Sequence, residues 1–153
     1  LCGSKRGREY KGETRMLLFQ NLHRYFLYVA LAFIVLLYAD VVYSCTWPVL
    51  NQTGDVTGHR FSVSVGSLVL FTTTTLLALY TFSCHSLRHL IGGKLNTFPD
   101  TIAGNTRFRL WSIVSLLNKN HMAFAWLSLF MVGFADFYIW MVARGVFFDP
   151  ALF

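Results

Sequence analysis

The chain has 153 residues, of which 55% are hydrophobic and only 13% are charged. A soluble domain carries about 25% charged residues, so this composition excludes an ordinary soluble enzyme and indicates a membrane protein. The net charge of +6 can be met by anionic lipid or acidic partners, so no nucleic acid is needed to explain it. Three cysteines give no disulfide framework of a small secreted protein.

The N-terminal segment is predicted to be a basic loop, residues 3–24, that follows the end of an apolar helix. The sequence begins with Leu1 and Cys2, without the basic start that a signal peptide places before its apolar core. We therefore expect one or more membrane helices before residue 1. A short amphipathic stretch that includes His23 then leads into the first long apolar segment.

Three apolar segments are long enough to cross a membrane. Residues 25–45 are apolar apart from Asp40, residues 61–84 contain no charge, and residues 122–143 carry only Asp136. About 20 residues of helix cover the roughly 30 Å of hydrocarbon in a bilayer. The predicted fold class is an all-α membrane protein, a transmembrane helical bundle with three spanning helices in this sequence. We expect one transmembrane anchor domain over residues 1–153.

The loops between the spans differ in charge, and this difference predicts their orientation. Eleven of the thirteen Lys and Arg residues lie in residues 3–24 and 85–121, and the other two are Arg60 and Arg144. Because Lys and Arg are enriched in cytoplasmic loops, these two segments are predicted to be cytoplasmic in a cell inner (plasma) membrane. The polar, glycine-bearing residues 46–60 are predicted to be a loop on the opposite face.

Thiols and imidazoles recur at one depth of the predicted bundle. His23 opens the first span, Cys84 closes the second and His121 opens the third. If Cys2 ends a preceding helix, it reaches the same leaflet. Two thiols and two imidazoles are the ligands of a Rieske [2Fe-2S] centre and can also bind zinc.

A simpler interpretation of these residues stays open. The Cys-x-His and Cys-x-x-His motifs of soluble Rieske domains are absent, and interfacial histidines often bond only to headgroups or carbonyls. His85 and His89 are four residues apart and share a helical face, so either could replace one of the imidazoles.

Two carboxylates lie inside predicted spans. Asp40 and Asp136 are 17 and 15 residues beyond His23 and His121, or about 22 to 26 Å along a helix. An intramembrane carboxylate is a candidate for a proton route or an outer ligand site. The alternative is that each is hydrated or paired with Arg near the membrane surface.

Three stretches of the sequence carry a resemblance to a known family. Asn21–Phe26, Cys84–Gly93 and Asn118–Phe130 together resemble the cytochrome-b-like membrane-anchor subunit of succinate dehydrogenase, in the haem-free class with a membrane-embedded Rieske-type cluster. The resemblance covers nearly the whole chain and would match the later part of a longer anchor. It implies an all-helical anchor that docks a flavoprotein subunit and an iron-sulfur subunit on its cytoplasmic face.

The resemblance also implies cofactors and ligands. Electrons from the soluble subunits would pass through the [2Fe-2S] cluster to a quinone, which we expect to be menaquinone. A haem b-bearing anchor is the alternative, because His23 and His121 could equally serve as haem ligands. By position, the cluster ligands would be Cys2, His23, Cys84 and His121, with His85 and His89 as alternates.

A quinone site is predicted just after Cys84. A quinone carbonyl gains negative charge on reduction and then needs a proton, so its pocket should combine cationic or neutral donors with aromatic surface. Arg88 can hold the oxygen, His89 can deliver the proton, and Trp111 can supply a flat wall. The alternative is that Arg88 snorkels to lipid phosphate and His89 faces water.

Two other function classes match parts of the sequence. The spacing of His85 and His89 resembles part of the histidine boxes of membrane di-iron oxygenases, but such enzymes need more than the five histidines present. An ion transporter or sensor could use Asp40 and Asp136 as an ion path.

Overall fold

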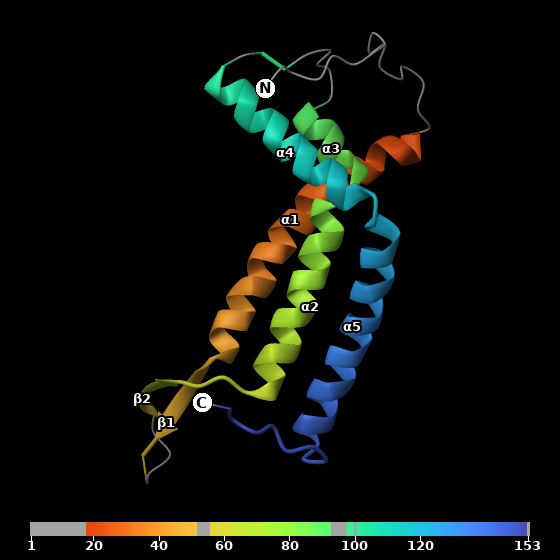
Figure 1. Cartoon of the computed structure of the whole chain (residues 1–153). Coiled ribbons are helices and arrows are strands. Elements are labelled where there is room, and N and C mark those ends of the chain that lie inside the picture. The colour runs from red at the N-terminus through yellow and green to blue at the C-terminus, as the bar shows by residue number, and fades with distance from the viewer. Residues whose placement is uncertain (1–17, 52–55, 93–97, 100, 153) are drawn as a thin grey trace. The chain divides into compact units, whose positions relative to one another are not determined.

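The computed structural model describes residues 18–51, 56–92, 98–99 and 101–152. These residues are mostly helical, with one small antiparallel sheet (Figure 1). The elements in chain order are α1 (Leu18–Ser44), β1 (Thr46–Leu50), β2 (Val56–Phe61), α2 (Val65–Phe82), α3 (His85–Gly92), α4 (Ile102–Asn118) and α5 (His121–Ala143).

Three of these helices are long and apolar enough to cross a membrane, which confirms the predicted fold class. They are Leu22–Ser44, Val65–Phe82 and His121–Ala143, with mean hydropathy values of 2.2, 1.6 and 1.7. Large apolar side chains on them remain exposed, for example Phe130 at 70% on α5. Such side chains are stable only against hydrocarbon or another apolar partner.

The chain divides into two compact units, and each is described separately. The first contains the described parts of Leu1–Leu31 and Leu79–Ala123, and the second contains Ala32–Ala78 and Phe124–Phe153. Helices α1, α2 and α5 each contribute residues to both units. The organisation as a single anchor domain stays a prediction.

In the first unit, α3 lies against α4 (Figure 1). Helix α4 begins at a Thr101 cap, whose hydroxyl accepts the N–H of Gly104 at 3.1 Å. Gly104 has no room for a Cβ because the Pro99 carbonyl lies against it. Gly92, at the end of α3, lies in the same way against the indole of Trp111, so the two helices approach closely.

The second unit contains a β-hairpin where a loop was predicted. Thr46 pairs with Phe61 and Trp47 pairs with Arg60 across the two strands. The predicted loop over residues 46–60 is therefore corrected, and Phe61 is the last residue of a strand instead of the first residue of a span. The β-branched residues of the segment favour the extended backbone, and Pro48 is tolerated because a two-stranded ribbon has free edges.

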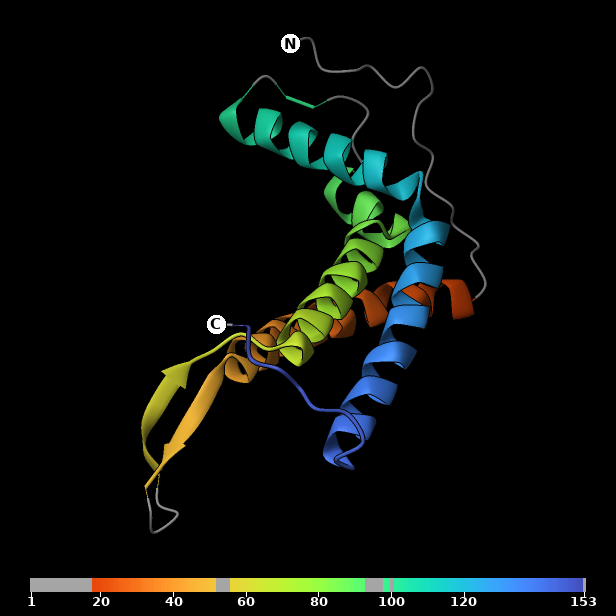
Figure 2. The ribbon, with the colours of Figure 1, turned by 60° about the horizontal axis from the view of Figure 1, so that its bottom comes forward.

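The backbone N–H groups at the start of α2 are satisfied by Ser64 and Ser67 and by the segment that follows α5. Ser64 and Ser67 cap the helix reciprocally, with the Ser67 N–H donating to the Ser64 hydroxyl at 3.2 Å and the Ser64 N–H donating to the Ser67 hydroxyl at 3.4 Å. The Gly66 N–H donates to the carboxylate of Asp149 at 2.9 Å, and the Val65 N–H donates to the Pro150 carbonyl at 3.3 Å. Figure 2 shows the segment after α5 running back toward the start of α2. Donors that a helix start leaves without partners are thereby satisfied.

Within the second unit, polar side chains join α1 and α2. The Tyr38 hydroxyl lies 3.3 Å from the Thr75 hydroxyl, and the Ser67 hydroxyl donates to the Ser44 carbonyl at 3.2 Å. Thr75 also donates to the Phe71 carbonyl one turn earlier at 2.8 Å. In hydrocarbon such back-bonding satisfies hydroxyls that have no water available.

Candidate functional site

A break between α2 and α3 shapes the candidate site. Helix α2 ends at Phe82, and α3 begins at His85. The Cys84 N–H donates to the Thr81 carbonyl and the Arg88 N–H donates to the Cys84 carbonyl, each at 3.2 Å. Ser83 is fully buried and Cys84 is 8% exposed. The turn therefore holds a thiol and a hydroxyl away from solvent.

The thiol of Cys84 meets a histidine from α1. Its Sγ lies 3.6 Å from Nε2 of His23, although the two residues are 61 positions apart in the sequence. A sulfur and an imidazole nitrogen at this distance are in hydrogen-bond contact. Both atoms are also the ones that would bind a soft or borderline metal. Two of the four predicted cluster ligands therefore lie side by side.

His121, the first residue of α5, is held by the same turn. Its Nδ1 lies 2.7 Å from the Ser83 hydroxyl, and its ring stacks on Tyr80 with centroids 4.8 Å apart. The side-chain amide of Asn118 donates to the Ser83 carbonyl at 2.7 Å, which fixes the turn from a second element.

The hydrogen bonds at Ser83 assign the tautomer of His121. The Ser83 hydroxyl donates its one proton to the Tyr80 carbonyl at 2.8 Å. Toward Nδ1 of His121 it can therefore only accept, so that nitrogen carries the proton. In this tautomer Nε2 carries the lone pair. Metal-ligating histidines have this arrangement, in which one nitrogen donates to a protein oxygen and the other binds the metal.

Among the described residues, two of the four predicted ligands are in direct contact, and a third lies against the same turn. Cys84 and His23 are in contact, and Ser83 links them to His121. The fourth, Cys2, lies outside the described residues. Within the part of the chain that the structure describes, no three His, Cys, Asp or Glu side chains form a metal-binding group. A Rieske-type cluster is held by two thiols and two imidazoles. The contacting pair, Cys84 and His23, supplies one donor of each type.

The alternate ligands lie on a different surface. His85 and His89 are exposed on α3, with their rings edge to face and their centroids 6.2 Å apart. The contacts of His23 and His121 with the Ser83–Cys84 turn favour those two as the imidazole ligands. This choice stays a prediction.

The predicted quinone residues gather on α3 and α4. The guanidinium of Arg88 lies over the indole of Trp111, 5.2 Å from the ring centroid. Trp111 packs beside the buried Phe98, with ring centroids 5.9 Å apart. Arg107 donates from Nε to the Ile91 carbonyl and ties the two helices together. A cation and an aromatic face are therefore adjacent within one turn of Cys84.

The two carboxylates predicted on the outer side are exposed, whereas Ser83 and Cys84 are buried. Asp40 and Asp136 are both exposed, and no ion pair involves either of them among the described residues. The hypothesis of Arg-paired carboxylates gains no support there. Their possible role in an ion path stays a prediction.

Sequence reasoning missed Ser83, Tyr80 and Asn118, which position His121. The available signal was weak: Ser83 precedes Cys84 directly, and Asn118 stands one turn before His121. It also missed Asp149, whose carboxylate accepts both the Gly66 N–H and the Tyr138 hydroxyl.

The chain is similar to known proteins over nearly its whole length. The family model described as actinobacterial succinate dehydrogenase subunit SdhC matches residues 2–145. A solved structure titled Mycobacterium smegmatis Sdh1 complex in the apo form contains a chain that is 36% identical, with a TM-score of 0.73. The alignment covers 95% of this chain and 50% of that one, so this sequence spans about half the length of its structural relative. A comparison with curated proteins gives no match.

Proposed function

Because this chain belongs to the family of actinobacterial succinate dehydrogenase subunit SdhC, we propose that it anchors a succinate:quinone oxidoreductase in the membrane. In this role it passes electrons from a flavoprotein subunit and an iron-sulfur subunit to a quinone. A Rieske-type [2Fe-2S] cluster would be held by Cys2, His23, Cys84 and His121 and would supply the one-electron transfer to the quinone.

The observation that carries the proposal is the contact of Cys84 with His23, next to the Ser83 hydroxyl that bonds to Nδ1 of His121. A bound [2Fe-2S] cluster would supply one-electron transfer at this position. The chain's own residues prepare the ligands: Ser83 keeps the proton of His121 on Nδ1, and Tyr80 covers the imidazole ring. Because Ser83 and Cys84 are buried, water is kept from the thiol.

The same contact favours a cluster over haem b. A Rieske-type cluster would be held by thiols as well as imidazoles, and Cys84 supplies a thiol in contact with His23. Family membership likewise favours the anchor over a di-iron oxygenase or an ion transporter. An optical spectrum of the purified complex distinguishes a [2Fe-2S] cluster from haem b, since haem b has strong visible bands.

The quinone would be reduced on the surface formed by Arg88, His89 and Trp111. Arg88 stays charged and can hold the carbonyl oxygen as negative charge develops there. His89 is exposed on the same helix and can deliver a proton. Menaquinone is the proposed acceptor, with its tail in lipid.

The soluble subunits would dock on the basic face. Residues 85–121 carry five of the thirteen Lys and Arg residues, and residues 3–24 carry six. Such loops are expected on the cytoplasmic side of the plasma membrane. The flavoprotein and iron-sulfur subunits would therefore meet this chain near Cys84, at the end of the electron path.

The decisive experiment replaces the thiol. Cys84→Ser should abolish the electron paramagnetic resonance signal of the reduced Rieske-type centre while the complex still assembles, because a hydroxyl replaces a thiolate poorly on iron. Cys45→Ser is the matched control, since Cys45 is a free cysteine in the second unit, and it should leave the signal unchanged. An unchanged signal in Cys84→Ser would remove this residue from the site.

A further inference from the structure

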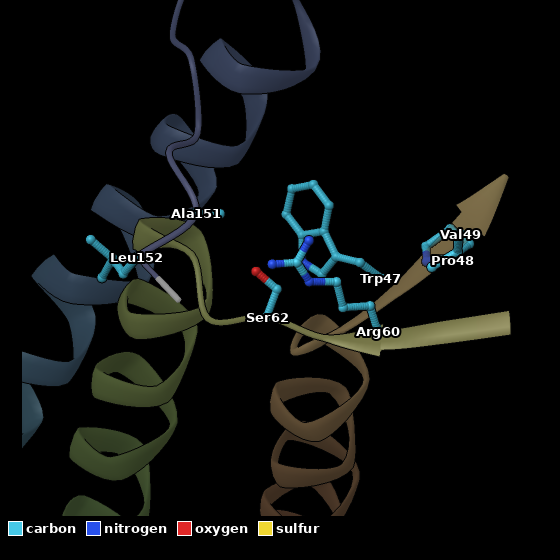
Figure 3. Close-up of a pocket in the computed structure, with 7 residues that line it drawn as sticks. All are labelled: Trp47, Pro48, Val49, Arg60, Ser62, Ala151 and Leu152. Carbon is cyan, nitrogen blue, oxygen red and sulfur yellow. The ribbon is translucent and has the colours of Figure 1, made fainter.

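A groove in the second unit lies between the hairpin and the C-terminal segment. Its volume is about 420 Å³. Trp47 and Arg60 are direct cross-strand partners, so their side chains stand on the same face of the ribbon. Figure 3 shows the Arg60 guanidinium beside the Trp47 indole, with the Ser62 hydroxyl pointing toward it. The residues that line the groove are Trp47, Pro48, Val49, Arg60, Ser62, Ala151 and Leu152.

The groove has a single positive charge in an otherwise uncharged wall. Arg60 is the one charged residue of the lining, and the described residues give it no carboxylate partner. Asp149, in the adjoining segment, already accepts the N–H of Gly66 and the hydroxyl of Tyr138. The groove is therefore complementary to an anion, and a guanidinium matches phosphate oxygens with two parallel hydrogen bonds.

The position of the groove favours a phospholipid over free phosphate as its occupant. The hairpin joins the end of α1 at Ser44 to the start of α2 at Val65, so the groove adjoins the ends of two spanning helices. Tryptophan is enriched at this depth of a bilayer, where its ring meets headgroups. Val49 and Leu152, 44% and 46% exposed, add apolar surface beside the charge. An occupant with a phosphate and an adjoining hydrocarbon chain fits both features, whereas free phosphate fits only the first.

We propose that this groove binds an anionic phospholipid, with the phosphate on Arg60 and Ser62 and an acyl chain across Trp47. The proposal does not depend on how electrons reach the quinone. It assigns a function to a segment that the electron-transfer site does not use.

Native mass spectrometry of the detergent-purified complex tests this proposal. The complex is incubated with phosphatidylglycerol or with phosphatidylcholine of the same acyl chains, and the lipid retained on this chain is measured. We expect phosphatidylglycerol to be retained in preference. Arg60→Gln should reduce its retention about tenfold, because charge-assisted hydrogen bonds are lost.

Arg144→Gln is the matched control. Arg144 lies 4.1 Å from the ring centroid of Trp140 and forms a similar Arg–Trp pair in the same unit, but it does not line the groove. Its replacement should leave retention unchanged. Equal loss in the two variants, or equal retention of both lipids by the unaltered chain, would overturn the proposal. Displacement of phosphatidylglycerol by millimolar inorganic phosphate would identify a phosphate site instead. If Arg60→Gln does not assemble, the comparison of the two lipids on the unaltered chain still decides.

Discussion

The two ends of α2 use polar side chains in opposite ways. At the start, the hydroxyls of Ser64 and Ser67 and the carboxylate of Asp149 satisfy backbone donors of the helix. At the other end, the Cys84 thiol lies against Nε2 of His23, and Nδ1 of His121 bonds to the Ser83 hydroxyl. The first arrangement stabilises a helix, and the second is the one that we propose prepares ligands.

The largest expected effect concerns the proposed quinone surface that follows Cys84. Arg88→Leu should lower quinone reduction about 100-fold, since one donor to a developing oxyanion is lost. Electron transfer from succinate to a soluble artificial acceptor should survive because it bypasses the membrane. Arg144→Leu, an exposed position outside the basic docking face, is the control and should retain both activities. Equal loss of both activities in Arg88→Leu would indicate failed assembly instead.

The start of α2 should respond in stability alone. Asp149→Ala removes the acceptor of the Gly66 N–H and the Tyr138 hydroxyl, so we expect a loss of about 2 kcal/mol in the free energy of unfolding. Thermal unfolding of the purified complex measures the change, and Asp149→Asn should recover part of it. Cluster spectra of the folded fraction should not change. A changed spectrum would contradict the division of roles between the two ends.

A smaller effect is expected from Ser83→Ala. Without its hydroxyl, Nδ1 of His121 loses its acceptor, and the tautomer that frees Nε2 is no longer favoured. We expect about a tenfold loss in cluster occupancy, measured as iron and acid-labile sulfide per complex. Ser86→Ala, also beside the turn, should retain full occupancy. Full occupancy in Ser83→Ala would show that Ser83 does not orient a ligand.

The sequence allowed the spans to be predicted because hydrocarbon demands long apolar helices, a signal carried by each segment alone. It did not reveal the hairpin, because the Gly and Asn residues between positions 46 and 60 read as turn formers. The contact of Cys84 with His23 followed from their shared depth. Ser83 and Asp149 could not be predicted in the same way, because each acts on a residue more than 35 positions away whose approach depends on packing.

The cap that Asp149 places on α2 also sets an order of events during biosynthesis. The carboxylate comes 83 positions after the amide that it binds. A ribosome therefore delivers α2 to the membrane well before the chain that completes its first turn has been made. Until α5 is inserted, that turn relies on Ser64 and Ser67 and on water at the membrane surface. Residues translated after α5 thus complete a helix whose own translation finished long before them.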